Sequence, residues 1–272
     1  MAEKISVALI GAGSMGGALL KGWLAAGVVD PGRSAVLEPN PGNVVKALAR
    51  QHAFSLNPDN ETRQFDVVAI AIKPQAAADA LPDYRALAKP ALVLSIMAGA
   101  SVASIAEALG GHQRIIRAMP NLPAAVSRGA SGLFAAPAAT KDDRAKAETL
   151  MRAVGAAVWV DDENLIDAVT AVSGSGPAYF FLLADALAQA ALETGISREA
   201  ATTLARATLE GAGAFAAADA RSAGELVKAV TSPGGTTAAA LSALDGDDAL
   251  LRNLVKEAVK RAYARGREMA RK

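Results

Sequence analysis

The fold of this chain is decided by the stretch Ile5-Ser-Val-Ala-Leu-Ile-Gly11-Ala-Gly13-Ser-Met-Gly16-Gly17. A short apolar run enters a turn rich in glycine, and the apolar residues after the turn have helical spacing. Gly11, Gly13 and Gly16 match the G-x-G-x-x-G pattern of a dinucleotide-binding β-α-β unit. There the first glycine makes the turn, the second lets the backbone approach a pyrophosphate, and the third packs helix against strand. A glycine-rich turn that serves only close packing is the alternative.

The composition is that of a globular protein of about two domains. Of 272 residues, 52% are apolar and 20% are charged, and the formal net charge is +1. Without a long basic block, we expect no nucleic acid and no membrane as a partner. The chain has no cysteine, and its two histidines, His52 and His112, are expected to be solvated, so we expect no metal site. The N-terminal apolar run does not fit a signal peptide, and we expect a cytoplasmic protein.

Apolar strand-like runs alternate with helical segments up to about residue 160. The run Val67–Ile72 has no polar alternation, which is typical of a parallel strand covered on both faces. This alternation predicts a Rossmann-type doubly wound α/β sheet. Strands are expected near residues 5–10, 34–38, 54–56, 67–72, 91–97, 114–119, 132–135 and 156–160.

Beyond Asp161 the strand patterns end and helix-forming residues dominate. We therefore expect a dinucleotide-binding domain at residues 1–161 and an all-α domain at residues 162–272. The segment 179–188 is apolar on almost every side, and such a helix must be covered on every side. We expect a second subunit to cover it, with a central helix in a monomeric bundle as the alternative. Helices are expected over residues 163–172, 177–194, 197–217, 222–230, 237–244 and 247–270.

Three further segments combine small or polar residues with the end of a predicted strand or helix. Ile72-Lys73-Pro74 and Ile116-Arg-Ala-Met-Pro-Asn121 each end a strand, where ligands of open α/β sheets bind. Lys73 either contacts a cofactor or solvates the strand end, and Asn121 either orients a ligand or belongs to an ordinary turn. Val172-Ser-Gly-Ser-Gly-Pro-Ala178 is expected to join two helices. It either cradles an anion or lets the two helices approach closely.

Ser232-Pro-Gly-Gly-Thr-Thr237 precedes another predicted helix, which Thr236 or Thr237 is expected to cap. A capping turn needs only one Ser or Thr. The additional hydroxyls and glycines favour a site where main-chain N–H groups and hydroxyls receive a carboxylate.

Taken in this order, the five motifs resemble those of the pyrroline-5-carboxylate reductase family over essentially the whole chain. The last three motifs are specific to that family, whereas many dehydrogenases share the glycine pattern. The resemblance implies reduction of 1-pyrroline-5-carboxylate to L-proline by hydride transfer from NADPH or NADH, the last step of proline biosynthesis. It also implies a homodimer or larger homo-oligomer with the site near the dimer interface. The alternatives are a β-hydroxyacid-type dehydrogenase or another imine dehydrogenase and, in a different class, a non-catalytic dinucleotide-binding regulator.

The resemblance and the motifs together assign site residues. Thr237 is the expected catalytic residue, because its hydroxyl can reach the ring nitrogen of the substrate. Substrate-binding residues are expected at Ser175, Ser232, Gly234, Gly235, Thr236 and Thr237. Cofactor-binding residues are expected at Gly11, Ala12, Gly13, Ser14, Met15, Gly16, Glu38, Asn40, Asn60, Ala71, Lys73, Pro74, Met97 and Asn121.

Glu38 departs from the family pattern. It ends the second predicted strand about 20 residues beyond Gly16, where an acidic residue binds the adenosine ribose hydroxyls of NAD. Family members that favour NADPH tend to have small polar or basic residues here, and a carboxylate repels the 2′-phosphate. The sequence therefore predicts weaker discrimination for NADPH than is usual, up to a preference for NADH. In the alternative, Glu38 points away, and Asn40 or Arg33 contacts the phosphate.

Overall fold

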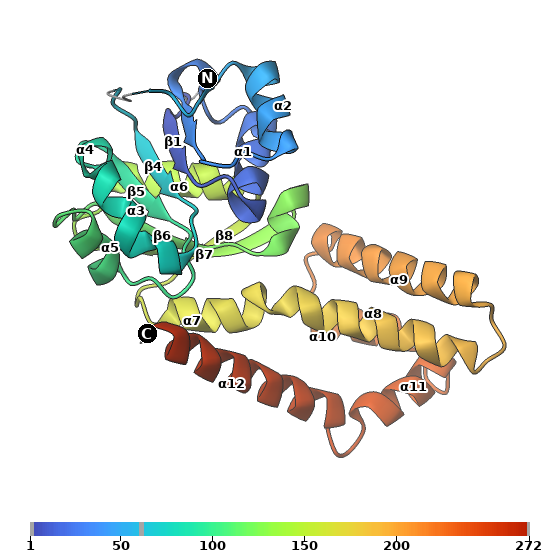
Figure 1. Cartoon of the computed structure of the whole chain (residues 1–272). Helices are drawn as coiled ribbons and strands as arrows, with labels where there is room; N and C mark the ends of the chain where they lie inside the picture. Colours follow the sequence, from blue (N-terminus) through green and yellow to red (C-terminus); the bar gives the residue numbers. More distant parts are fainter. Residues whose placement is uncertain (1–2, 60–62, 271–272) are drawn as a thin grey trace. The chain divides into compact units, whose positions relative to one another are not determined.

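The computed structural model describes residues 3–59 and 63–270, apart from the side chains of residues 269 and 270. The chain forms two compact units (Figure 1). One unit is the N-terminal part up to Ser175 together with the end of the chain from Ala262, and the other is Gly176–Arg261. The division into functional domains at residue 161 stays a prediction.

The first unit is built on an eight-stranded sheet with the order β3-β2-β1-β4-β5-β6-β7-β8. Strands β1 to β6 are parallel, and the order reverses between β1 and β4, because the chain adds β2 and β3 on one side of β1 and β4 on the other. This confirms the predicted Rossmann-type sheet. The strands are β1 (Val7–Ile10), β2 (Ala35–Leu37), β3 (Ser55–Leu56), β4 (Val67–Ile70), β5 (Leu92–Ser95), β6 (Ile115–Met119), β7 (Gly129–Ala135) and β8 (Gly155–Trp159).

The last two strands run against the others. β7 pairs antiparallel with β6, and β8 pairs parallel with β7. Between β6 and β7 the only helical element is the short 3₁₀ helix Leu122–Val126. A parallel neighbour needs a crossover of a dozen or more residues, usually with an α-helix, so this short connection gives the antiparallel direction.

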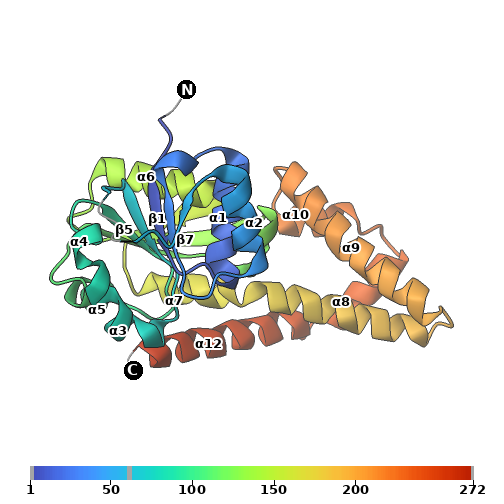
Figure 2. The ribbon, with the colours of Figure 1, turned by 45° about the horizontal axis from the view of Figure 1, so that its top comes forward.

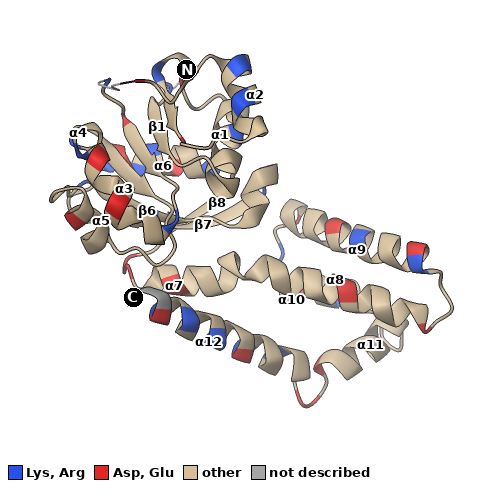
Figure 3. Ribbon diagram, in the orientation of Figure 1, with Lys and Arg blue, Asp and Glu red and all other residues tan. Residues whose placement is uncertain are grey.

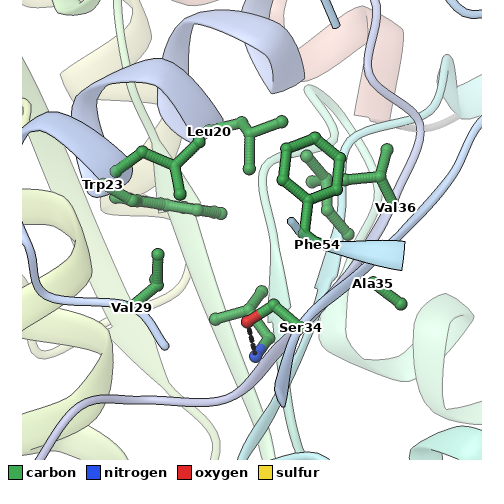
Figure 4. A pocket seen from close by; sticks show the side chains of 10 residues that line it. Leu20, Trp23, Val29, Ser34, Ala35, Val36 and Phe54 are labelled. Atoms are coloured by element: carbon green, nitrogen blue, oxygen red, sulfur yellow. Dashed lines mark hydrogen bonds between the residues drawn. The ribbon is translucent and has the colours of Figure 1, made fainter. Parts of the chain in front are cut away.

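Helices cover both faces of the sheet (Figure 2). On one face the indole N–H of the fully buried Trp23 donates to the carbonyl oxygen of Leu150 at 2.9 Å and ties α1 to α6. A gap of about 10 Å³ beside Trp23, between α1 and the strands, is too small for a ligand (Figure 4). The helices on this face are α1 (Ser14–Ala26), α2 (Asn43–His52) and α6 (Lys141–Arg152), and those on the other are α3 (Ala77–Ala80), α4 (Arg85–Ala88) and α5 (Val102–Ala108).

The rest of the chain is helical, and local signals mark several of its helix ends. Ser197 caps α9 through the amide of Ala200, and Ser222 and Glu225 form a reciprocal capping box on α10. Gly195, with φ of 88°, follows the end of α8. The helices are α7 (Leu165–Val169), α8 (Gly176–Leu192), α9 (Arg198–Ala218), α10 (Ala223–Ala229), α11 (Thr236–Asp245) and α12 (Leu250–Ala270).

Helix α8 leaves a large apolar surface uncovered in the single chain. Asp185 is its only charged residue, as the sparse colouring of α8 in Figure 3 reflects. Phe180 is 61% exposed and Leu182 is 69% exposed, although both are apolar. The continuous helix Leu165–Leu192 is also long and apolar enough to cross a membrane, by length and composition alone. A surface of this kind needs a partner, because monomers rarely expose large contiguous apolar patches.

The segment 172–178 corrects one prediction. It was expected to join two helices as a loop, but it lies within the continuous helix Leu165–Leu192. Residues Thr170–Gly174 form a π-helical turn, in which the Ser175 amide donates to the carbonyl oxygen of Thr170 at 2.8 Å. A π-turn accommodates one additional residue without ending the helix.

Candidate functional site

The three glycines of the N-terminal motif have the three geometries that their pattern requires. Gly11 has φ of +86°, and a Cβ atom there would lie 2.8 Å from the carbonyl oxygen of Ala71. A Cβ atom at Gly16 would collide with the carbonyl oxygen of Gly11, whereas a Cβ atom at Gly13 would meet nothing within 4 Å. Gly11 therefore makes the turn at the switch point between β1 and β4, Gly16 packs α1 against it, and Gly13 faces open space.

The start of α1 offers main-chain donors beside that open space. Gly13 is the N-cap and supplies no side-chain cap, and the amide of Gly17 makes a 2.8 Å bond to the Gly13 carbonyl oxygen. The amides of Ser14, Met15 and Gly16 thus have no acceptor within the helix. A 13-residue helix without acidic residues in its first turn also has a partial positive charge at this end. This cradle fits the pyrophosphate of a dinucleotide.

Glu38 follows β2 and points toward the glycine turn. Its Oε2 atom accepts a hydrogen bond from the amide of Ala12 at 2.8 Å, and its Oε1 atom accepts one from the amide of Asn40 at 3.0 Å. The alternative in which Glu38 points away is therefore wrong. Arg33 does not lie beside Glu38. It pairs with Asp66 at 3.9 Å, and both residues precede their strands, β2 and β4, at the amino ends of these parallel strands, whereas Glu38 follows the carboxyl end of β2.

The predicted contacts at the ends of β4 and β5 differ in exposure. Ala71 is half-buried against the glycine turn. Lys73 is exposed and precedes the 3₁₀ helix that begins at Pro74. The Met97 side chain is 3% exposed and packs in the core under α3 to α5, so any ligand contact there would come from its main chain. Asn60 lies outside the described residues.

Asn121 holds the π-turn next to the sheet. Its Nδ2 atom donates to the carbonyl oxygen of Ser173 at 2.9 Å, and its Oδ1 atom accepts from the amide of Ala130 at 2.9 Å. Pro177, four residues after Ser173, has no N–H and cannot make the usual helical bond to that carbonyl. The Asn121 side chain, 7% exposed, supplies the missing donor. Its predicted role as a cofactor contact remains a prediction.

An ion pair that the sequence analysis missed fixes the start of the helical region. Arg117 on β6 is 6% exposed, and its Nη1 atom lies 2.7 Å from Oε1 of Glu163. The same oxygen accepts the amide of Val102, the first residue of α5, at 2.7 Å. The signal was an arginine inside the apolar run of residues 115–119, since a buried arginine requires a carboxylate or an equivalent acceptor.

The segment Ser232–Thr237 lies in the second unit and forms a turn followed by a helix. The amide of Gly235 donates to the Ser232 carbonyl oxygen at 3.0 Å, and Gly234 has φ of 70°, which together with Pro233 is the pattern of a type II turn. Gly235 is the N-cap of α11, and no side chain caps the helix. The prediction that Thr236 or Thr237 caps it is therefore wrong.

The uncapped start of α11 has free donors. The first helical bond there runs from Ala239 to Gly235 at 3.2 Å. The amides of Thr236, Thr237 and Ala238 have no acceptor within the helix. Because a glycine rather than a hydroxyl residue occupies the N-cap, these amides can receive an anion, and the half-buried Thr237 adds a hydroxyl.

Within residues 3–59 and 63–270, no three His, Asp or Glu side chains gather to hold a metal ion. His112 is half-buried rather than fully solvated, and one ring nitrogen lies 3.0 Å from the Arg114 carbonyl oxygen. Burial lowers the pKa of His112 and favours the neutral ring. It lies next to the amino end of β6, away from the glycine turn.

Two family matches cover different parts of the chain. Residues 163–269 match the family described as pyrroline-5-carboxylate reductase dimerisation. Residues 6–99 match the family described as NADP oxidoreductase, coenzyme F420-dependent.

Whole-chain relatives agree with the first match. The chain is 38% identical to the pyrroline-5-carboxylate reductase of Methanosarcina acetivorans, over 99% of this chain and 100% of that protein. It is 39% identical to the enzyme of the same name from Pseudomonas aeruginosa, over 97% and 96%.

Solved structures extend the similarity to the fold. A pyrroline-5-carboxylate reductase from Coxiella burnetii superposes with a TM-score of 0.90 at 35% identity, covering 98% of this chain and 99% of that one. The pyrroline carboxylate reductase of Plasmodium falciparum, solved with NADP bound, gives a TM-score of 0.81 at 26% identity, over 99% and 100%.

Proposed function

The chain belongs to the pyrroline-5-carboxylate reductase family, whose reaction is the reduction of 1-pyrroline-5-carboxylate to L-proline with NADPH or NADH. We propose that the glycine turn of this chain binds the cofactor and that its Ser232–Thr237 segment binds the substrate. The observation that supports this proposal is the uncapped start of α11, where free amides lie in the same helical turn as Thr237.

The cofactor half consists of the glycine turn and the neighbouring strand ends. The amides of Ser14, Met15 and Gly16 receive the pyrophosphate, and the open space at Gly13 lets the phosphates approach the backbone. The ends of β4, β5 and β6 line the same edge of the sheet, where the nicotinamide of a doubly wound fold is expected. Lys73 and Met97 lie on this edge, as do Ala71, Pro74 and Asn121.

The substrate half binds the carboxylate. The amides of Thr236, Thr237 and Ala238, with the partial positive charge of the α11 N-terminus, receive the two carboxylate oxygens. Ser232 and the two glycines shape the approach, because a Cβ atom at Gly235 would collide with the Ser232 hydroxyl. The Thr237 hydroxyl then lies beside the ring nitrogen and fixes the plane of the imine. Ser175 is part of the same proposed substrate set.

This reduction depends more on the orientation of the substrate relative to the cofactor than on strong acids or bases. When bound, the reduced cofactor supplies a hydride to the carbon of the C=N bond. The substrate nitrogen takes its proton from water, and the protonated imine is already a good hydride acceptor. The residues of the chain bring the reacting carbons together and exclude competing orientations, which accounts for much of the rate of such a reaction.

The chain acts as a homo-oligomer, since residues 163–269 match a dimerisation family. We place the substrate site near the dimer interface, because the apolar face of α8, in the same helical region as the Ser232–Thr237 segment, needs a partner to cover it. The cytoplasm is the proposed location, as the substrate and the cofactor are small soluble metabolites.

The activity is tested by the loss of nicotinamide absorbance at 340 nm after addition of 1-pyrroline-5-carboxylate. The matched substrate is 1-pyrroline, which has the same ring without the carboxylate. We expect turnover with the first and a fall in kcat/KM of at least a hundredfold with the second, and Thr237→Ala should lower turnover more than Thr237→Ser. Equal turnover of both substrates, or full activity of Thr237→Ala, would contradict the assigned carboxylate site.

A further inference from the structure

The backbone of Glu38 is fixed by a side chain from the next strand along the sheet edge. The amide of Glu38 donates to Oδ1 of Asn57 at 2.8 Å, and Nδ2 of Asn57 donates back to the Glu38 carbonyl oxygen at 2.8 Å. Asn57 directly follows β3 and adopts φ of 48°, a conformation that asparagine tolerates better than most residues. This two-way bond holds the main chain of Glu38 at the carboxyl end of β2.

The carboxylate of Glu38 is fixed as well. One oxygen accepts the amide of Ala12, which lies inside the glycine turn, and the other accepts the amide of Asn40. Each oxygen keeps a free lone pair, because a carboxylate can accept about four hydrogen bonds. The negative charge is therefore held beside the turn proposed to receive the pyrophosphate, and each carboxylate oxygen can accept another hydrogen bond.

We propose that Glu38 makes this enzyme prefer NADH to NADPH. The two adenosine ribose hydroxyls of NADH donate to the free lone pairs of the Glu38 carboxylate. NADPH carries a phosphate on one of these hydroxyls, so it loses that donor and brings a negative charge against the carboxylate. The inference rests on the proposed function only in that the bound cofactor is a nicotinamide dinucleotide.

No ion pair neutralises Glu38 within the described residues. Arg33 forms an ion pair with Asp66 at the amino ends of β2 and β4, whereas Glu38 lies at the carboxyl end of β2. Burial raises the pKa of the Tyr84 phenol, and the negative charges of Asp83 and Glu38 raise it further. Positive features after β2 include the N-terminus of α2, whose N-cap Gly42 supplies no side-chain cap, and the exposed Lys46 and Arg50 on that helix.

Binding measurements separate this inference from the reaction itself. Isothermal titration calorimetry with NAD⁺ and with NADP⁺, in the absence of substrate, gives the ratio of their dissociation constants. We expect the wild-type protein to bind NAD⁺ at least tenfold more tightly. Glu38→Gln keeps an oxygen for the Ala12 amide and removes the charge, and Glu38→Ser removes both charge and length. Each variant should shift the ratio at least tenfold toward NADP⁺.

The controls decide between Glu38 and its surroundings. Glu107→Gln removes the same charge from the exposed face of α5 and should leave the ratio unchanged. Adding Asn40→Arg to Glu38→Ser should move the ratio further toward NADP⁺, because arginine binds phosphate through two donors. Tighter binding of NADP⁺ than NAD⁺ by the wild-type protein would overturn the inference. It would also be overturned if both Glu38 variants kept the wild-type ratio while Lys46→Ala lost NADP⁺ affinity.

Turnover gives an independent comparison. The ratio of kcat/KM for NADH and NADPH should follow the binding ratio in the wild-type protein and in each variant. If the protein binds NAD⁺ selectively but reduces no imine, the proposed function fails and the role of Glu38 stands. If imine reduction proceeds equally well with both cofactors, the proposed function stands and the role of Glu38 fails.

Discussion

The side-chain amide of Asn121 donates to the carbonyl oxygen of Ser173 at 2.9 Å. That carbonyl lacks its ordinary helical partner, because Pro177 has no N–H. Two motifs that are distant in the sequence, one ending β6 and one forming the π-turn, are therefore a single structural unit. Asn121, at the end of a strand, therefore supplies the donor that Pro177, in the first turn of α8, lacks.

Removing the Asn121 side chain should destabilise the fold. Asn121→Ala leaves the Ser173 carbonyl and the Ala130 amide without partners, and each such loss costs about 1–3 kcal/mol. We expect a loss of about 2–4 kcal/mol in the free energy of unfolding, measured by urea denaturation. Asn253→Ala is the matched control, because its bond to Asp248 is exposed and should contribute little. Equal stability of the two variants would show that the Asn121 bond does not hold the π-turn.

The glycine turn allows stability and cofactor binding to be separated. Gly13→Ala adds a methyl group in open space at φ of −65°, so the free energy of unfolding should change by no more than about 0.5 kcal/mol. The same methyl group occupies the approach of the pyrophosphate, and cofactor affinity should fall at least tenfold. Gly11→Ala is the contrasting variant, because φ of +86° and the Ala71 carbonyl oppose a side chain there. Gly11→Ala should therefore clearly lower the melting temperature. Unchanged cofactor affinity in Gly13→Ala would exclude the cradle as the pyrophosphate-binding site.

Much of the fold could be predicted because its signals are local. The glycine turn, the capping box of Ser222 and Glu225 and the glycine after α8 at Gly195 each depend on residues a few positions apart. Glu38 could be placed at the end of β2 because the strand and the motif fix its position. The residues between β4 and β5 were not assigned, since Pro74, Pro82 and Pro90 interrupt any regular pattern and leave only short helices.

The remaining features depend on contacts between distant residues. The π-turn exists alongside Asn121, 52 residues away from Ser173 in the sequence, and no local pattern distinguishes it from a loop. The partner of Arg117 is Glu163, 46 residues further on, which by itself looked like an ordinary first-turn residue of a helix. The cap of α11 was misassigned because two threonines follow Gly235 and both have capping side chains, whereas the main chain uses the glycine.

Stability at low pH should depend on Asp143. Burial raises the pKa of this carboxyl, but bonds from Arg114 at 2.6 and 3.1 Å and from the Thr140 amide at 2.9 Å outweigh burial and hold it below its ordinary value. The stabilisation is therefore complete above the unfolded pKa of about 3.9 and is lost as the pH falls through the lower folded value. The free energy of unfolding of the wild-type protein should fall more steeply below about pH 4 than that of Asp143→Asn. Parallel curves for the two proteins would contradict the pairing.

Assembly should depend on the apolar face of α8. Leu182 is 69% exposed in the single chain, and burying a leucine contributes about 1.5–3 kcal/mol. Leu182→Glu should shift the sedimentation coefficient toward the monomer and lower activity in parallel. Glu199→Lys, an equally drastic change on the exposed start of α9, is the control and should change neither. A monomeric wild-type protein with full activity would remove the need for a partner at the site.

The central claim, that the glycine turn and the Ser232–Thr237 segment together reduce a cyclic imine to L-proline, is tested most directly by stoichiometry. Limiting NADH is mixed with the protein and 1-pyrroline-5-carboxylate, the decrease at 340 nm is followed to its end, and L-proline is quantified in the same sample. We predict one L-proline for each NADH oxidised, and a slower change of both signals in Thr237→Ala. Oxidation of NADH or NADPH without L-proline, or no oxidation of either while both bind, would contradict the account.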